Sequence, residues 1–380
     1  MIFKKVKRKY LKYASWWTSR FTLHTLFIHC FGYGLSRLRC KKLVFGCGLL
    51  SILIIIGSIN CGGFKRRAVG IENQILIFVS DEDKPYVQSL VDSVFGRVVY
   101  TPRPEPIFEL IFSDPDQFRE KKFNHNILVI SVFNPPDSTG DILVRSLLPK
   151  DQYNSAKKGE NHIFSRKNRF SIGQVVAILA AENIEILLVS IEEKERWLFD
   201  QFNIPFLERQ KKHMFKRLEQ KELSKEFSEK YGWRMRIQHD YLVIKEDPEH
   251  NFIWLGRSFP FRWISVKWIE NASELDLNTE IATDMIKELP QYFTEKIRFI
   301  DYHYKIEETF FNQWQAWRAE GLWEHLDKVK GGPFVSYVFY DGVSDRIYHI
   351  NFLIYNPGNP KIVLLRQMDI MVHTFSVMGS

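Results

Sequence analysis

The sequence predicts an α+β protein in which antiparallel sheets are covered by helices, built as two halves behind an N-terminal hydrophobic segment. Residues 73–203 alternate short apolar runs with helical patterns, residues 232–380 contain mostly strand patterns, and residues 43–60 carry no charge. These observations place the boundaries. We expect residues 1–42 to be either a cytoplasmic extension or the result of a start codon assigned too early, residues 43–60 to be a signal or transmembrane segment, and residues 61–72 to be a tether. The body then consists of a first half at 73–203, a charged connecting helix at 204–231 and a second half at 232–380.

The apolar run from Leu43 to Cys61 follows the basic pair Lys41 and Lys42 and is followed by two glycines. A basic start, a short apolar run and an exit of small residues are typical of an export signal. A cysteine at that exit predicts a bacterial lipoprotein that is cleaved before Cys61 and acylated there. Two acyl chains would hold the protein on the bilayer, because each buried methylene contributes about 0.8 kcal/mol.

An uncleaved signal anchor is the alternative interpretation of the same residues. The uncharged run is close to the lower limit for spanning a bilayer, about 17 residues. Asn60 stands where lipoproteins usually have a small residue, and the leader before the apolar run is long. Both features leave open a single-pass membrane protein that keeps residues 1–42 as a cytoplasmic tail.

Charge and cysteine are distributed unevenly along the chain. Residues 1–60 hold eleven of the 53 lysines and arginines and none of the 45 acids, which leaves 42 basic and 45 acidic residues for the remainder. The basic excess therefore belongs to the leader, as the positive-inside rule expects, and a nucleic-acid partner is not predicted. All four cysteines lie in the first 61 residues, so we expect neither disulfides nor a cysteine-rich metal site in the body.

In the first half, apolar runs and helical spacing follow one another. We expect strands at 75–79, 107–112, 127–133, 163–164 and 174–180, and helices at 80–95, 115–122 and 182–202. Ser80 is expected to cap the first helix, since a serine hydroxyl can accept from the free amides of the first turn. Pro102, Pro104 and Pro106 indicate an extended connection.

A charged surface helix is expected at 205–230, followed by a second half rich in strands. The expected strands are 233–237, 241–245, 252–256, 262–269, 302–311, 313–323, 334–340 and 346–355. The last of these alternates apolar and polar residues, with His349 and Asn351 on one face, which predicts a half-buried strand. We expect one helix at 278–289 and a closing helix that begins with Asn359 as cap and Pro360 at its first position.

No catalytic motif with a defined spacing occurs in the chain. GxSxG, HExxH, GxxxxGK[ST] and GxGxxG are all missing, so we assign no catalytic residue, metal or cofactor. Paired acids at Glu307 and Glu308, or at Glu320 and Glu324, could serve glycoside chemistry only if they faced each other across a cleft.

An aromatic segment is the one unusual local feature. It contains Trp314, Trp317, Arg318 and Trp323, and strand alternation puts Trp317 and Trp323 on one face and Trp314 and Arg318 on the other. These side chains either pack in the core beneath a helix or form a platform that binds a sugar or a peptide.

Several sequence blocks resemble one family. They are GGPFVSY at 331–337, FLIYNP at 352–357, the charged helix 208–230 and the segments 241–247 and 251–255. The chain is similar, over about residues 72–377, to Bacteroidetes lipoproteins with domain of unknown function 4837. The resemblance implies lipidation at Cys61 and an address in a Gram-negative envelope, and it implies no activity.

Three functional hypotheses follow from the sequence. The first is a non-catalytic lipoprotein, anchored to the bilayer, that binds or scaffolds an envelope protein or glycan in the periplasm. The second is an envelope hydrolase that acts on glycan or peptide through acids from separate strands. The third is the uncleaved, signal-anchored membrane protein.

Overall fold

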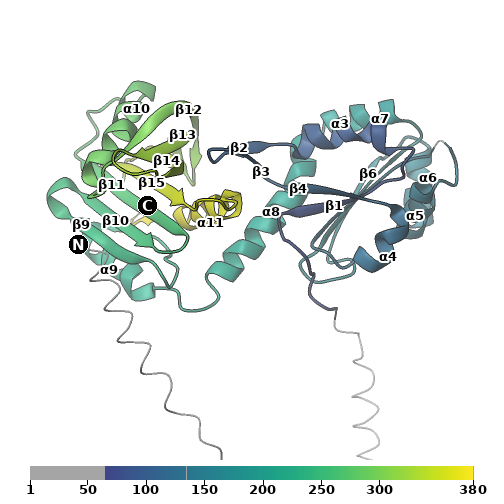
Figure 1. The fold of residues 1–380 in the computed structure, drawn as a ribbon, viewed down its shortest axis with the longest axis horizontal. Coiled ribbons are helices and arrows are strands. Elements are labelled where there is room, and N and C mark those ends of the chain that lie inside the picture. Colours follow the sequence, from purple (N-terminus) through teal and green to yellow (C-terminus); the bar gives the residue numbers. More distant parts are fainter. Residues whose placement is uncertain (1–64, 134, 380) are drawn as a thin grey trace, which may run out of the picture. The chain divides into compact units, whose positions relative to one another are not determined.

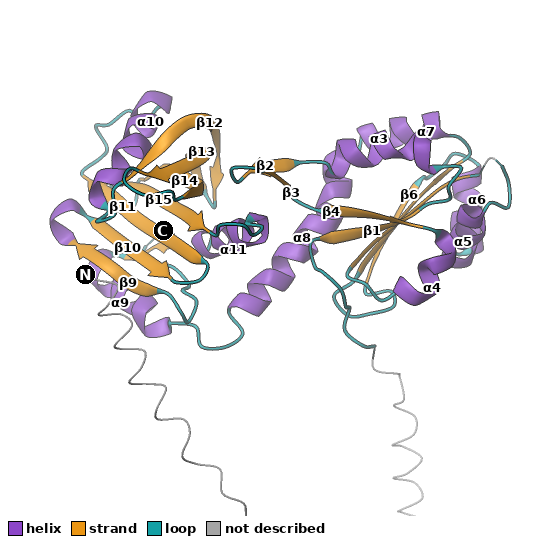
Figure 2. Ribbon diagram, viewed as in Figure 1, coloured by secondary structure: helices purple, strands orange, loops and turns teal. Residues whose placement is uncertain are grey.

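The computed structural model describes residues 65–133 and 135–379, which form an α+β protein with two large sheets (Figures 1 and 2). The predicted α+β class is confirmed, but the expectation of antiparallel sheets holds for the second half and not for the first, where most strand pairs are parallel. The expectations for the extension at 1–42, the segment at 43–60 and Cys61 lie outside the described residues. Within the described part, no helix combines the length and the apolar character needed to cross a membrane.

The first half, residues 65–214, is built around a five-stranded sheet in the order β4-β1-β5-β7-β6. Its strands are β1 (Gln74–Phe78), β4 (Glu109–Ser113), β5 (Asn126–Val132), β6 (Ile163–Lys167) and β7 (Val175–Ala181). Three pairs are parallel, β1 with β4, β1 with β5 and β5 with β7, and only β6 with β7 is antiparallel. Every residue of β5 and β7 is buried, as expected for parallel strands covered on both faces.

Helices cover both faces of this sheet (Figure 2). One face carries α3 (Lys84–Phe95), α7 (Ile184–Glu192) and α8 (Glu195–Met214). The other carries η1 (Pro115–Gln117), α4 (Phe118–Lys121), α5 (Thr139–Leu147) and α6 (Lys150–Lys157). The described part of the predicted tether is tied to this half, because Arg67 bridges Ile172 and Val69 bridges Asn124. The three prolines lie in or beside a hairpin of β2 (Val98–Tyr100) and β3 (Pro104–Pro106).

Two predicted helix boundaries in this region are wrong. The first helix begins at Lys84, and the Ser80 hydroxyl accepts from the Asp83 amide before the helix starts. The single connecting helix expected at 204–231 is two helices, since α8 continues through Pro205 to Met214 and α9 (Lys221–Tyr231) follows after a break. Proline inside a helix costs about 3 kcal/mol. The burial of Phe202 and Phe206 on either side of Pro205 offsets that cost.

The second half, residues 221–379, contains a seven-stranded antiparallel sheet in the order β12-β13-β14-β15-β11-β10-β9. Its strands are β9 (Leu242–Asp247), β10 (Phe252–Arg257), β11 (Phe261–Glu270), β12 (Ile297–Phe311), β13 (Trp314–His325), β14 (Gly331–Asp341) and β15 (Arg346–Tyr355). A small separate pair joins β8 (Trp233–Arg234) to β16 (Ser376–Val377). The helices are α9, η2 (Pro248–His250), α10 (Thr279–Glu288), η3 (Leu289–Tyr292) and α11 (Ile362–Val372).

Both faces of this sheet are covered, so the prediction of a half-buried strand at 346–355 is wrong. One face packs against α9 and α11, and the other packs against α10 and η3. His349 and Asn351 are 0% and 1% exposed, although strand alternation alone placed them toward solvent. The alternation of polar and apolar residues in β15 reflects a buried polar cluster and not a solvent-facing side.

The start of the closing helix also differs from the prediction. Lys361, and not Asn359, is the N-cap of α11, and its side chain makes no capping hydrogen bond. The carboxylate of Glu105, from β3 of the first half, accepts from the backbone amides of Lys361 and Ile362 at 2.6 and 2.8 Å. The helix predicted at 278–289 is confirmed as α10, with Asn278 as its N-cap.

Candidate functional site

The two halves meet along α8 and α11, and a chain of polar side chains crosses the boundary. Gln210 of α8 donates to Glu72 at 2.7 Å, and Gln367 of α11 donates to Gln210 at 2.8 Å. Arg262 of β11 in turn donates to Gln367 at 3.2 Å. Since these side chains come from both halves, their hydrogen bonds fix α11 against α8.

A cavity of about 210 Å³ lies at this boundary, and we call it the junction cavity. Its apolar walls come from both halves: Val99, Ile107, Phe199, Val335, Phe352, Ile362 and Leu365. Its polar lining consists of Arg97, Asn203, Arg318, Arg366 and Asp369. Apolar walls with a few converging polar groups are typical of sites that bind small molecules.

Arg318 and Asp369 belong to a polar network on one wall of the junction cavity. The Tyr337 hydroxyl donates to Asp369 Oδ1 at 2.8 Å and accepts from Arg318 Nε at 3.3 Å. Burial raises the pKa of Tyr337 well above its ordinary value, so that the hydroxyl keeps its proton. Burial disfavours the charged form of Asp369, but hydrogen bonds from His373 and Tyr337 outweigh it and lower the pKa of this carboxyl.

Arg318 also gathers two of the acids that the sequence singled out. Its Nη1 lies 2.7 Å from Glu320 Oε2 and 3.7 Å from Glu307 Oε1. The pair Glu307 and Glu308 is therefore split, and Glu307 shares the guanidinium with an acid of the neighbouring strand. Both carboxylates act as counter-ions of Arg318 in this arrangement.

Arg366, on α11, is a charged residue of the junction cavity whose hydrogen-bond partners are all neutral. Its guanidinium donates to the Asn203 side chain and, at 3.4 Å, to the carbonyl of Ile107. The guanidinium carbon lies 3.7 Å from the centre of the Phe206 ring. Within residues 65–133 and 135–379, no carboxylate comes within 4.0 Å of it. Burial lowers the pKa of Arg366 to about 9.

The four residues predicted as a binding platform do not form one surface. Trp314 and Trp323 are buried, and their indole nitrogens donate to Asp341 and to the carbonyl of Ile354. Trp317 and Trp323 pack in the core covered by α10, whereas Trp314 packs in the opposite core. Of the four, only Arg318 lines the junction cavity.

Sequence reasoning missed the other polar residues of the junction cavity. Arg366 and Asp369 lie on a closing helix that was described only by its apolar stripe, and Arg97 follows α3. The available signal was the interruption of an otherwise apolar helix by charged residues at 366 and 369. Such residues on a helix that is buried on several sides need partners.

A buried polar cluster also lies on the face of the second sheet that α10 covers. His349 Nε2 lies 3.1 Å from the Ser336 hydroxyl, and the Asn351 amide donates to the same hydroxyl at 2.9 Å. A serine beside a histidine can act as a nucleophile and base. Here all three side chains are at most 1% exposed, so a substrate has no access to them.

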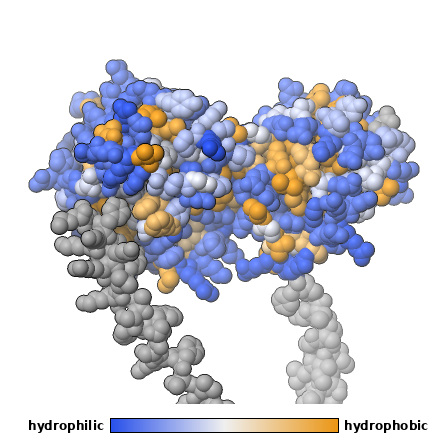
Figure 3. Space-filling model, viewed as in Figure 1, coloured by the Kyte–Doolittle hydropathy of each residue, from blue (hydrophilic) through white to orange (hydrophobic). Residues whose placement is uncertain are grey.

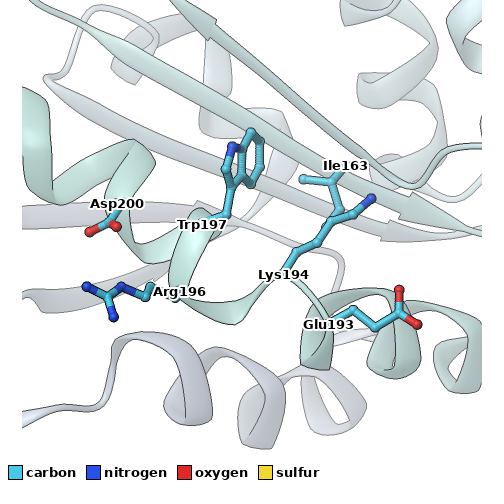
Figure 4. A pocket seen from close by; sticks show the side chains of 6 residues that line it. All are labelled: Ile163, Glu193, Lys194, Arg196, Trp197 and Asp200. Carbon is cyan, nitrogen blue, oxygen red and sulfur yellow. The ribbon is translucent and has the colours of Figure 1, made fainter.

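A broad surface depression near β6 and α8, of about 720 Å³, is shown in Figure 4. It is lined by Ile163, Glu193, Lys194, Arg196, Trp197 and Asp200. Arg196 and Glu193 point in different directions, so charged groups do not converge there. Among the described residues, no group of three or more histidines, cysteines or acids is placed to hold a metal ion.

Two family models match separate parts of the chain. Residues 220–374 match Domain of unknown function (DUF4837), and residues 68–215 match Domain of unknown function (DUF8532). The domain named in the sequence resemblance is confirmed for residues 220–374, whereas the first half matches a different model. Comparison with curated protein sequences gives no match.

Solved structures show only distant similarity. The Saccharomyces cerevisiae Ran-binding protein Mog1p is 12% identical with a TM-score of 0.28, over 38% of this chain and 90% of that protein. LpqN of Mycobacterium tuberculosis, described as involved in cell envelope biogenesis, is 6% identical with a TM-score of 0.26, over 38% of this chain and 83% of that one. Similarity at this level supports no statement about function. By sequence, the two halves of the body match models of two different domains of unknown function.

Proposed function

We propose that the protein is a non-catalytic binding or scaffolding protein, held on a membrane by its N-terminal segment with its body in the periplasm. The observation that carries the anchor is the uncharged run that ends at Cys61 after a leader with eleven basic and no acidic residues. The basic residues Lys65, Arg66 and Arg67 follow Cys61 by four to six positions. Basic residues next to a lipid anchor would be attracted to anionic headgroups.

The junction cavity supports binding as the role of the body. It combines apolar walls with polar groups that have protein partners, and among its three arginines Arg366 is the one without a carboxylate within 4.0 Å in the described residues. The match of residues 220–374 to DUF4837 supports the resemblance on which the lipoprotein address and the envelope partner rest. An envelope protein or glycan is the proposed macromolecular partner.

The experiment that tests the anchor compares the wild-type chain with Cys61→Ser in a Gram-negative host. We expect the wild-type protein to begin at Cys61, to carry the mass of attached acyl chains and to fractionate with membranes. Cys61→Ser should retain the leader and lack the lipid mass, whereas the matched control Cys47→Ser should behave like the wild type. Intact-mass analysis and membrane fractionation measure both properties.

Two outcomes would contradict this proposal. If Cys61→Ser is cleaved and carries the lipid mass as the wild type does, Cys61 is not the processing site. Intact mass decides this, because a variant that keeps the apolar leader also stays with membranes. If the wild-type protein keeps residues 1–60, the uncleaved signal anchor is correct. A separate experiment identifies the partner. Whole envelopes are crosslinked, and we expect an envelope protein or glycan to co-purify with the wild type and not with a variant that lacks residues 1–61.

A further inference from the structure

Three arginines from three separate elements line the junction cavity. Arg97 follows α3, Arg318 lies on β13 and Arg366 lies on α11. Arg97 pairs with Glu195 at 2.8 Å, and Arg318 pairs with Glu320 at 2.7 Å. Only Arg366 lacks a carboxylate within 4.0 Å in the part of the chain that the structure describes.

The environment of Arg366 leaves its charge incompletely balanced. A buried charge is costly unless an opposite charge and hydrogen bonds compensate it. Its hydrogen bonds go to neutral groups, the Asn203 side chain and the Ile107 carbonyl, and its guanidinium lies over the rings of Phe206 and Phe108. The charge of Asp369 also acts on Arg366, but not from within 4.0 Å. Asp369, the acid that shares the cavity, already accepts from Tyr337 at 2.8 Å and lies 3.4 Å from His373. Arg366 therefore has no direct carboxylate partner, and a further anion at this position would balance its charge.

The size and walls of the cavity restrict that anion. A volume of about 210 Å³ lies below the roughly 300–1,000 Å³ of pockets for drug-sized ligands, so the occupant is small. Phe199, Val335, Phe352 and Leu365 provide an apolar surface from both halves. Asp369 in the same lining repels additional negative charge, which favours a monoanion over a dianion.

We infer that the junction cavity binds a small amphipathic carboxylate, with its carboxylate on Arg366 and its apolar part against Phe199, Phe352 and Leu365. A planar guanidinium binds a carboxylate through two parallel hydrogen bonds, which gives both affinity and orientation. Because the walls belong to both halves, the bound molecule would join them. The inference rests on the proposed binding role of the body and not on its lipid anchor.

The test uses the full-length protein in lipid nanodiscs and the probe 3-phenylpropionate, with empty nanodiscs as background. Isothermal titration should give saturable binding, with a Kd at least tenfold lower than for 3-phenylpropylamine or 3-phenylpropanol, which share the apolar part. Phenyl phosphate at pH 8, mostly a dianion, should bind more weakly than 3-phenylpropionate. Arg366→Gln should weaken binding of 3-phenylpropionate at least tenfold, and the exposed control Arg119→Gln should not change it.

Several results would overturn the inference. The first is the absence of saturable binding to the wild-type protein. The second is equal affinity for 3-phenylpropionate, 3-phenylpropylamine and 3-phenylpropanol. The third is an unchanged affinity for 3-phenylpropionate in Arg366→Gln. The comparison of probes needs no variant, so it holds even if Arg366→Gln fails to fold. A failure of the anchor proposal can be told apart from a failure of the binding inference. If only the anchor proposal is wrong, Cys61→Ser is processed like the wild type and the affinity for 3-phenylpropionate stays the same.

Discussion

At the scale of single residues, His349 is buried by its tertiary neighbours although the alternation of residues in its strand predicted exposure to solvent. It is fully buried on β15, with one ring nitrogen 3.1 Å from the Ser336 hydroxyl. Burial, reinforced by the positive charge of Lys267, lowers the pKa of His349 to about 3. In the unfolded chain, the imidazole gains a proton as the pH falls below about 6.5. In the folded protein it stays neutral until the pH approaches 3.

This difference predicts a pH-dependent stability. The unfolded chain binds a proton at His349 below about pH 6.5 and the folded protein does not, so the stabilising contribution is present above pH 6.5 and is lost as the pH falls. Between pH 6 and pH 4, this one site should reduce the free energy of unfolding by about 1.4 kcal/mol per pH unit. Urea denaturation at several pH values measures the slope for the wild type and for His349→Gln.

The variant should lose that part of the slope, whereas the exposed control His239→Gln should keep it. His373 contributes with the opposite sign. Burial disfavours its charged form, but the hydrogen bond and charge of Asp369 outweigh burial and raise its pKa. Only the difference between variants therefore isolates His349, and equal slopes for wild type and His349→Gln would contradict the prediction.

At the scale of elements, α11 shows that a helix can be capped by a distant part of the chain. Its first amides donate to the carboxylate of Glu105, which lies in the other half and 256 residues away from Lys361. An anion at a helix N-terminus also interacts favourably with the helix dipole. The hairpin of β2 and β3 thus contributes directly to the start of the closing helix.

Replacing that carboxylate should weaken the folded protein. Glu105→Ala leaves the amides of Lys361 and Ile362 without their acceptor, so we expect the free energy of unfolding to fall by about 1–2 kcal/mol. Glu105→Gln keeps an oxygen acceptor without the charge and should lie between Glu105→Ala and the wild type. Urea denaturation checks the order, with the exposed control Glu274→Ala. A midpoint of Glu105→Ala equal to that of the wild type would show that α11 does not depend on Glu105.

At the scale of the whole molecule, net charge separates the leader from the body. The chain has a formal net charge of +8, yet the residues after position 60 contain 42 basic and 45 acidic side chains. The described surface in Figure 3 combines hydrophilic areas with apolar patches. Cleavage before Cys61 would therefore reverse the sign of the net charge.

This reversal predicts the isoelectric behaviour of the mature protein. After detergent extraction, the wild-type protein should focus below pH 7, because cleavage removes eleven basic residues and no acid. Cys61→Ser, which is expected to keep the leader, should focus well above pH 7 and serves as the control. Isoelectric focusing above pH 7 for the wild-type protein would instead show that the leader remains attached.

Local sequence patterns were enough for much of this architecture. Short-range periodicity predicted the apolar runs at β5 and β7, the helical spacing of α10 and most strands of the second sheet. Neighbouring residues are enough to set such patterns. Where a partner far along the chain decided the outcome, local patterns failed. The continuation of α8 through Pro205 depends on the burial of Phe202 and Phe206, and the burial of His349 depends on α10.

The sequence by itself determined the α+β class, most strands and helices, and the separation of a basic leader from a slightly acidic body. These properties depend on periodicity and composition, which need no knowledge of distant neighbours. Only the tertiary structure decided that Trp314 and Trp323 lie in two cores, that Glu105 caps α11 and that Arg97, Arg318 and Arg366 meet at one cavity. The physical reason is that burial and charge pairing depend on which side chains meet after folding, and these come from opposite ends of the body.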